Sequence, residues 1–196
     1  MNKLRDQIKM ENDITKALEV LRGGGILLYP TDTVWGLGCD AGNEKAIAKL
    51  FQLKKRAESK SLIVLVADEN QLLRCVKDVP EIAWDLIENT DRPLTIIYDS
   101  VNGLAPSVKA EDGSAGIRIV KDEFCEKLIR KFGKPIVSTS ANISGEPTPS
   151  TFAEIKNEIK LQVDYVVSWR QDDNKKSQPS VIIKLALNGE FKIIRS

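Results

Sequence analysis

Small polar residues follow two apolar runs of strand length. Ser138–Gly145 reads Ser-Thr-Ser-Ala-Asn-Ile-Ser-Gly and comes directly after Pro135–Val137. Residues 30–38 read Pro-Thr-Asp-Thr-Val-Trp-Gly-Leu-Gly and come directly after Ile26–Tyr29. Hydroxyls, glycines and backbone donors at strand ends suit a loop that a charged ligand approaches closely. Both segments therefore predict loops that bind an anion.

Cations occur beside these segments. Lys54 and Arg56 close an amphipathic helical pattern, where positive charge at a helix C-terminus is worth about 0.3–1 kcal/mol. Lys60 follows just before the apolar run that begins at Leu62, so its charge lies at the mouth of a buried strand. Arg118 sits inside an apolar strand pattern, where an unpaired guanidinium is costly to bury. We expect it either on an edge strand facing water or as a clamp for a carboxylate, which arginine binds through two hydrogen bonds.

Composition excludes several classes of protein. The 196 residues include 29 Lys and Arg and 28 Asp and Glu, and this near balance argues against coating nucleic acid or membrane by bulk charge. The hydrophobic content of 42% allows a substantial core. Histidine is absent, which removes the commonest general base and metal ligand. Cys39, Cys75 and Cys125 are widely spaced, which indicates reduced thiols and no dedicated zinc site.

Several known motifs and signals are missing. No Ser-His-Asp arrangement is possible without histidine, and no Walker motif occurs. Gly36-Leu-Gly38 lacks the third glycine of a dinucleotide fingerprint. No N-terminal apolar region resembles a signal peptide, and no window approaches the roughly 20 apolar residues of a membrane span. We therefore expect a soluble cytoplasmic protein with no membrane partner.

Helical and strand patterns alternate along the chain. A helix is expected after the cap candidate Asn12, and Thr151 with Glu154 predicts a capping box for another. Residues 30–38 and 99–114 are expected to be loops, and Asn188-Gly189 predicts a hairpin between two late strands. Alternating elements with a hairpin at the end indicate an α/β domain with a mixed sheet.

Four segments together resemble the TsaC/YrdC family, the threonylcarbamoyl-AMP synthases. They are Tyr29–Gly38, Leu53–Arg56, Gly116–Ile119 and Ser138–Gly145, and their Lys-x-Arg and Ser-x-Asn pairs form a specific signature of that family. The resemblance implies an α/β fold with a twisted, open, mixed but mostly parallel sheet, flanking helices and a large concave face. It also implies a single YrdC-like domain over residues 1–196.

The resemblance further implies a nucleotidyl transfer. L-threonine, bicarbonate and ATP would give threonylcarbamoyl-AMP and pyrophosphate, with Mg²⁺ arriving as Mg-ATP. The product would pass to a tRNA threonylcarbamoyltransferase complex for modification of tRNA, and contact with tRNA itself is a further expectation. Both reactants are anionic, so positioning and electrostatic stabilisation suffice for such a step without a covalent intermediate.

Motif position assigns roles to individual residues. The expected catalytic residues are Lys54, Arg56, Ser140 and Asn142, of which Lys54 and Arg56 would hold ATP phosphates with Lys60. The expected ATP contacts are Arg56, Lys60, Ser114, Ser140, Asn142, Thr148 and Arg195. The expected threonine contacts are Thr33, Arg118, Ser138 and Ser180, with Arg118 on the carboxylate. No residue is assigned to a metal.

Several positions depart from the family pattern, and two of them bear on the threonine pocket. Val181 replaces a usual threonine after Ser180, and Leu65 stands where some relatives have a histidine. These departures leave two alternatives open: a paralogue that acts as an RNA-binding module, and one that acts on another carbamoyl substrate.

Overall fold

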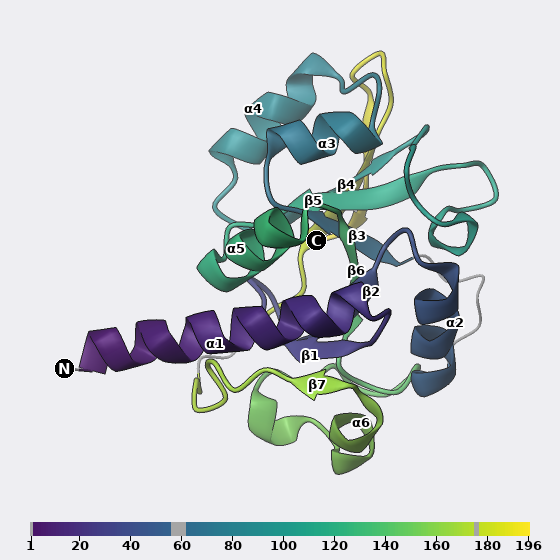
Figure 1. Cartoon of the computed structure of the whole chain (residues 1–196). Coiled ribbons are helices and arrows are strands. Elements are labelled where there is room, and N and C mark those ends of the chain that lie inside the picture. The colour runs from purple at the N-terminus through teal and green to yellow at the C-terminus, as the bar shows by residue number, and fades with distance from the viewer. Residues whose placement is uncertain (1, 56–61, 175–176) are drawn as a thin grey trace.

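Helices and strands alternate along the chain, as the sequence pattern predicts (Figure 1). The computed structural model describes residues 2–55, 62–174 and 177–196. The helices are α1 (Asn2–Arg22), α2 (Glu44–Leu53), α3 (Glu69–Cys75), α4 (Glu81–Asn89), α5 (Glu123–Phe132) and α6 (Asn157–Gln162), with 3₁₀ turns η1 (Pro106–Val108) and η2 (Phe152–Glu154). The strands are β1 (Leu27–Tyr29), β2 (Gly36–Asp40), β3 (Ile63–Val66), β4 (Leu94–Tyr98), β5 (Ala115–Ile119), β6 (Ile136–Ser140), β7 (Tyr165–Val166), β8 (Val181–Leu185) and β9 (Phe191–Arg195).

The strands described form one mixed sheet in the order β7-β1-β2-β6-β3-β5-β4-β8-β9. The predicted mixed α/β fold is confirmed, but the expected parallel majority is wrong. Among the described strands, the parallel pairs are β1–β7, β3–β5 and β4–β8, and the other neighbours are antiparallel. The chain reverses between β1 and β2 and between β8 and β9 through short connections, which join antiparallel neighbours without a crossover helix.

The C-terminal hairpin forms as predicted. Gly189 has a φ of 86°, the left-handed conformation that this turn requires, and the side chain of Asn188 accepts a hydrogen bond from the amide of Glu190. β9 is the edge strand of the sheet, and its last residue, Arg195, pairs with Ile182 of β8. The hairpin thereby brings Arg195, near the end of the chain, beside β8.

Two expected segment boundaries are wrong. α1 begins at Asn2, ten residues before the cap candidate Asn12, because the preceding residues contain no glycine or proline and the helix continues through them. Thr151 forms no side-chain cap, and the residues after it form η2 before α6 begins at Asn157. In the predicted capping box, Glu154 would accept a hydrogen bond from the amide of Thr151. It accepts one from the amide of Ser150 instead.

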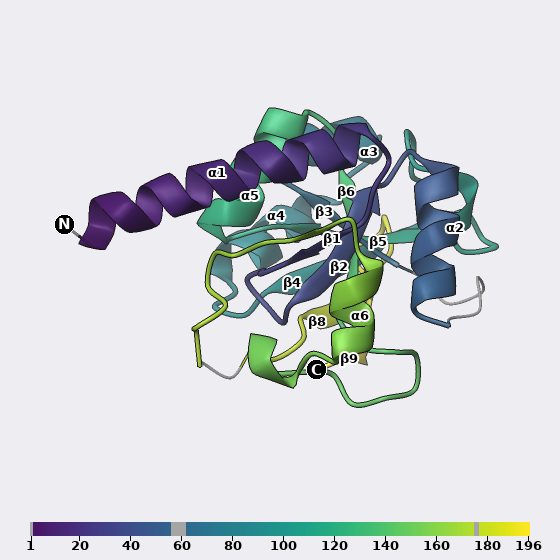
Figure 2. The same ribbon diagram turned by 60° about the horizontal axis from the view of Figure 1, so that its bottom comes forward.

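Apolar side chains cover both faces of the sheet. Leu27 and Tyr29 belong to the apolar cluster that includes α1 and α5, whereas Leu28, between them, belongs to a second cluster that includes residues of α2, α3 and α4. Figure 2 shows α1 and α5 lying together over the sheet. Strand side chains alternate between faces, so these continuous apolar runs belong to a sheet that is buried on both sides. Among the helices described, none has the length and apolar character to cross a membrane.

Candidate functional site

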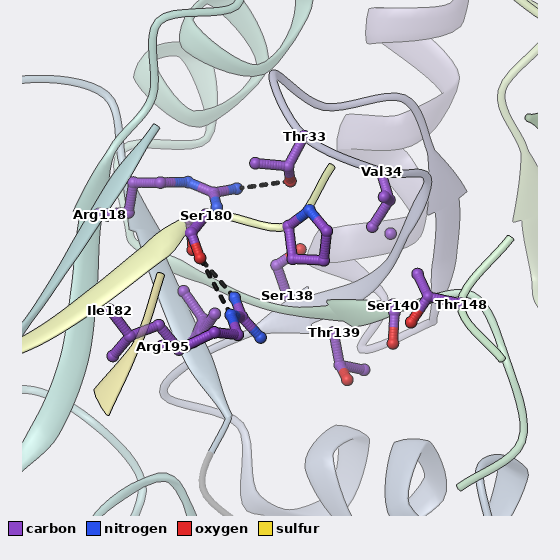
Figure 3. A pocket seen from close by; sticks show the side chains of 13 residues that line it. Thr33, Val34, Arg118, Ser138, Thr139, Ser140, Thr148, Ser180, Ile182 and Arg195 are labelled. Carbon is purple, nitrogen blue, oxygen red and sulfur yellow. Dashed lines mark hydrogen bonds between the residues drawn. The ribbon is translucent and has the colours of Figure 1, made fainter. Parts of the chain in front are cut away.

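A cavity of about 280 Å³ lies where six of the strands present their ends or inner faces (Figure 3). Its walls come from β2, β3, β5, β6, β8 and β9 and from the loops beside them. The cavity brings together seven of the residues that the sequence predicted: Thr33, Arg118, Ser138, Ser140, Thr148, Ser180 and Arg195. Residues from both halves of the chain therefore share one site.

Arg118 lies on β5 inside the sheet, between β3 and β4, so the expectation of an edge strand facing water is wrong. It is only 3% exposed, and its Nη2 donates to the hydroxyl of Thr33 at 3.3 Å. The same nitrogen lies 3.1 Å from a carboxylate oxygen of Asp32. Its buried Nε has no hydrogen-bond partner among the described residues. The guanidinium is therefore charge-paired with Asp32, and Arg118 also lines the cavity.

Arg195 places a second guanidinium at the same cavity. Its Nε donates to the backbone oxygen of Ser180 at 3.0 Å, and its Nη2 donates to the Ser180 hydroxyl at 3.2 Å (Figure 3). The Ser180 hydroxyl also shares a hydrogen bond of 2.8 Å with the hydroxyl of Thr95 on the next strand. Burial and the charge of Arg118 lower the pKa of Arg195. Two guanidiniums that repel one another across a cavity favour an anionic ligand between them.

Ser138 and Ser140 lie within β6, so the expectation that a loop begins at Ser138 is wrong. They pair with Gly38 and Gly36 of β2, a strand that the sequence pattern placed in a loop. A Cβ atom on Gly36 would lie 2.9 Å from the Ser138 hydroxyl, so glycine is needed for this close approach. The hydroxyls are thus carried by a rigid strand, which holds them more firmly than a loop does.

Lys54 follows the end of α2 and is 2% exposed. Its ammonium donates to the backbone oxygen of Ser140 at 2.5 Å and to that of Asn142 at 2.7 Å. The sequence assigned this ammonium to the phosphates of ATP, but here it holds the turn that follows β6. These two hydrogen bonds fix the backbone that carries Ser140 and Asn142.

Asn142 faces a neighbouring cavity of about 350 Å³. Its side-chain amide donates to the backbone oxygens of Ile143 at 3.0 Å and Glu146 at 2.7 Å. Thr148 lines both cavities and so marks the place where they adjoin. Ser140 therefore lines the first cavity, and Asn142 lines the neighbouring one.

Of the remaining predicted residues, one lies away from the cavity and two fall outside the described residues. Ser114 is 4% exposed and lies outside it, and both its amide and its hydroxyl donate to the same carboxylate oxygen of Asp112. Arg56 and Lys60 lie outside the described residues. Their positions relative to the cavity stay predictions.

The cavity lining described contains two arginines, several hydroxyls and apolar groups, but no carboxylate, lysine or thiol. Within residues 2–55, 62–174 and 177–196, no group of three His, Cys, Asp or Glu side chains is placed to hold a metal. The arrangement is suited to binding an anion and stabilising charge on it. It has no acidic or thiol nucleophile of its own among these residues.

Two functional features were missed by sequence reasoning. Asp32 is not among the residues to which motif position assigned a role, but its carboxylate lies against Arg118. The signal was available: a lone arginine in an apolar strand requires a buried counter-charge. The apolar side of the cavity, formed by Val34, Ile63 and Ile182, had no distinguishing signal because apolar residues occur throughout every strand.

Comparison with known proteins gives consistent matches over most of the chain. The family model Sua5/YciO/YrdC, described as telomere recombination, matches residues 19–196. A threonylcarbamoyl-AMP synthase of Pseudoalteromonas translucida is 33% identical over 183 residues, which cover 92% of this chain and 96% of that protein. A threonylcarbamoyl-AMP synthase of Idiomarina loihiensis is 32% identical over 171 residues, which cover 86% of this chain and 91% of that protein.

Solved structures share the fold. P. abyssi Sua5 in complex with L-threonine has a TM-score of 0.76 and 27% identity, over 88% of this chain and 50% of that chain. E. coli YciO has a TM-score of 0.80 and 24% identity, over 93% of this chain and 88% of that chain. The chain thus spans about half of the Sua5 structure and most of the YciO structure.

Proposed function

Because the chain belongs to the Sua5/YciO/YrdC family, we propose that it is a threonylcarbamoyl-AMP synthase that converts L-threonine, bicarbonate and ATP to threonylcarbamoyl-AMP and pyrophosphate. One structural observation carries this proposal. Arg118 and Arg195 meet at a single cavity whose other polar groups are hydroxyls. Such a site matches an amino acid carboxylate placed beside a phosphate.

Arg118 would bind the carboxylate of threonine. Arg118 lines the cavity, and its planar guanidinium carries donors whose geometry matches a carboxylate. The hydroxyls of Thr33, Ser138 and Ser180 lie around the same space and would bind the amino acid's remaining polar groups. The apolar side of the cavity suits the methyl group of threonine.

Arg195, Ser140 and Thr148 would contact the nucleotide. Asn142 would bind it from the adjoining cavity, and Arg56, Lys60 and Ser114 are proposed contacts by motif position. The threonine amine attacks the carbon of bicarbonate, and a C–O bond breaks with loss of water to leave a carbamate. A carbamate oxygen then attacks the α-phosphorus of ATP, and the bond from that phosphorus to pyrophosphate breaks. Arginines would stabilise the negative charge that develops on the phosphoryl oxygens, while Lys54 would hold Ser140 and Asn142 in place.

Mg²⁺ would enter as part of Mg-ATP. The described lining offers no carboxylate for it, so phosphate oxygens and water would be its ligands. We further propose that the reaction takes place in the cytoplasm and that the reactive mixed anhydride passes directly to a tRNA threonylcarbamoyltransferase complex. Contact with tRNA is part of this proposal.

Release of pyrophosphate tests the proposed function. The purified protein is incubated with Mg-ATP, L-threonine and ¹³C-bicarbonate, and pyrophosphate and labelled threonylcarbamoyl-AMP are measured. We expect both products to depend on threonine and to fall at least about 100-fold in Arg118→Gln. Arg74→Gln, at an exposed position on α3, is the matched control and should be as active as the unmodified protein. Pyrophosphate formed at the same rate without threonine would contradict the proposal.

A further inference from the structure

Asp32 and Arg118 form a buried ion pair directly behind the cavity wall. Their side chains are 8% and 3% exposed, and the carboxylate oxygen lies 3.1 Å from the guanidinium nitrogen. Arg118 lines the cavity, but Asp32 does not. Asp32 is therefore placed to act on a ligand only through the arginine.

The carboxylate of Asp32 is itself held in place. Its second oxygen accepts a hydrogen bond from the amide of Lys121 at 3.3 Å. The turn that carries it is closed by Thr31, whose hydroxyl accepts from the amide of Thr33 at 2.9 Å and donates to the backbone oxygen of Val34 at 2.8 Å. Asp32 thus belongs to a rigid turn, whereas the side chain of Arg118 is long.

A second pair of charges braces the same turn from outside. Arg170 donates to the backbone oxygen of Thr31 at 3.4 Å and to the carboxylate of Asp122 at 2.8 Å. Burial raises the pKa of Asp122, and the nearby charge of Asp32 adds to this effect. The carboxylate of Asp122 forms an ion pair with Arg170, whereas the carboxylate of Asp32 forms an ion pair with Arg118.

The contacts of Arg118 are confined to one side of its guanidinium. Nη2 carries the contacts with Asp32 and with the Thr33 hydroxyl, and Nε is buried without a hydrogen-bond partner among the described residues. Figure 3 shows the guanidinium extended toward Thr33 at the side of the cavity. A free arginine side chain loses rotamer entropy when it binds, so fixing it before the ligand arrives favours binding.

We propose that Asp32 is the positioning residue for Arg118: it holds the guanidinium in the one orientation that binds an α-carboxylate. The identity of the ligand as an amino acid rests on the proposed function. The claim that Asp32 orients Arg118 in the free protein is independent of the proposed function. Asp32 takes no part in the reaction itself.

Asp32→Asn tests the proposal, because it keeps the size of the side chain and removes its charge. We expect KM for threonine to rise about 10-fold, with kcat and KM for ATP changing less than about 2-fold. The matched control is Asp40→Asn, since Asp40 is also a buried aspartate in an ion pair, 3.1 Å from Lys134, but lies outside the cavity. A rise in KM in both variants, or in neither, would overturn the proposal.

A ligand that lacks the carboxylate distinguishes loss of Arg118 orientation from a general loss of structure at the site. Calorimetry compares L-threonine with L-threoninamide, and we expect the preference for threonine to fall about 10-fold in Asp32→Asn. A purely structural role of Asp32 would weaken both ligands equally. Tighter binding of threonine by the variant would show that Asp32 competes for Arg118, which contradicts the proposal.

Arginine Nε–H signals in the NMR spectrum of the free protein test positioning without any ligand. The Arg118 signal is assigned by its loss in Arg118→Lys. We expect one sharp signal in the unmodified protein and in Asp40→Asn, and a broadened or split signal in Asp32→Asn. A sharp, unshifted signal in Asp32→Asn would overturn the proposal. If the unmodified protein bound no amino acid, the proposed function would fail, while this spectrum would still decide the role of Asp32.

Discussion

The ammonium of Lys54 donates a hydrogen bond of 2.7 Å to the backbone oxygen of Asn142, 88 residues further along the chain. A second bond, to the backbone oxygen of Ser140, makes the lysine a clamp between the end of α2 and the turn after β6. The amide of Ser144 closes the link by donating to the backbone oxygen of Lys54 at 2.9 Å. Lys54 and the turn that carries Asn142 and Ser144 are thus held together by three hydrogen bonds.

Replacing Lys54 with methionine tests this clamp. The change preserves most of the side chain's volume but leaves two partly buried carbonyl oxygens without this donor, so we expect the free energy of unfolding to fall by about 1–3 kcal/mol. Chemical denaturation measures the change. Lys55→Met is the control, because the Lys55 side chain is exposed and pairs with Glu158 at the surface. That pair should contribute about 1 kcal/mol or less.

Arg118→Lys distinguishes a shaped carboxylate clamp from a simple positive charge. Lysine keeps the charge but lacks the planar donors, so we expect binding of L-threonine to weaken about 10- to 100-fold. Binding of Mg-ATP alone should change less than about 3-fold. Calorimetry measures both, with Arg92→Lys at an exposed position as the control. Equal weakening of the two ligands would argue against a role specific to the carboxylate.

Gly36→Ala probes the close approach of β2 and β6. The added Cβ would lie 2.9 Å from the Ser138 hydroxyl and 3.4 Å from Thr31, so one of them must move. We expect a loss of about 1–3 kcal/mol in stability and weaker threonine binding. Gly42→Ala should be tolerated, since its Cβ would meet nothing closer than 3.4 Å. Unchanged stability and binding in Gly36→Ala would refute this account of the site wall.

Thiol labelling tests the burial of the three cysteines. Burial raises the pKa of Cys39 to about 12 and also raises that of Cys125, so both thiols are neutral and unreactive at pH 8. We expect an aromatic disulfide reagent to react with the three thiols at least about 100-fold faster in the urea-unfolded protein than in the folded protein. The pKa of the Cys39 thiol is about 9 in the unfolded chain and about 12 in the folded protein, so unfolding releases a proton between these pH values. The free energy of unfolding should therefore fall as the pH rises through that range. Cys39→Ala should reduce this pH dependence, and equal slopes would contradict it.

Local patterns predicted much of the fold because they depend on neighbouring residues. Asn188 and Gly189 form the turn of the predicted C-terminal hairpin, and Gly189 takes the left-handed conformation. Patterns failed where distant contacts decide the backbone. β2 is rich in glycine and looks like a loop, but it is held as a strand by pairing with β1 and β6.

The sequence by itself determined the types of chemistry available to this protein: arginines, hydroxyls and amides, with no histidine. It also determined the alternation of elements and the motifs that identify the family. Only the tertiary structure decided which of these groups meet. Arg118 pairs with Asp32, and Lys54 binds backbone oxygens of a turn far along the chain. The physical reason is that sheet order and side-chain direction, set by burial of two apolar faces, decide where a charge finds its partner.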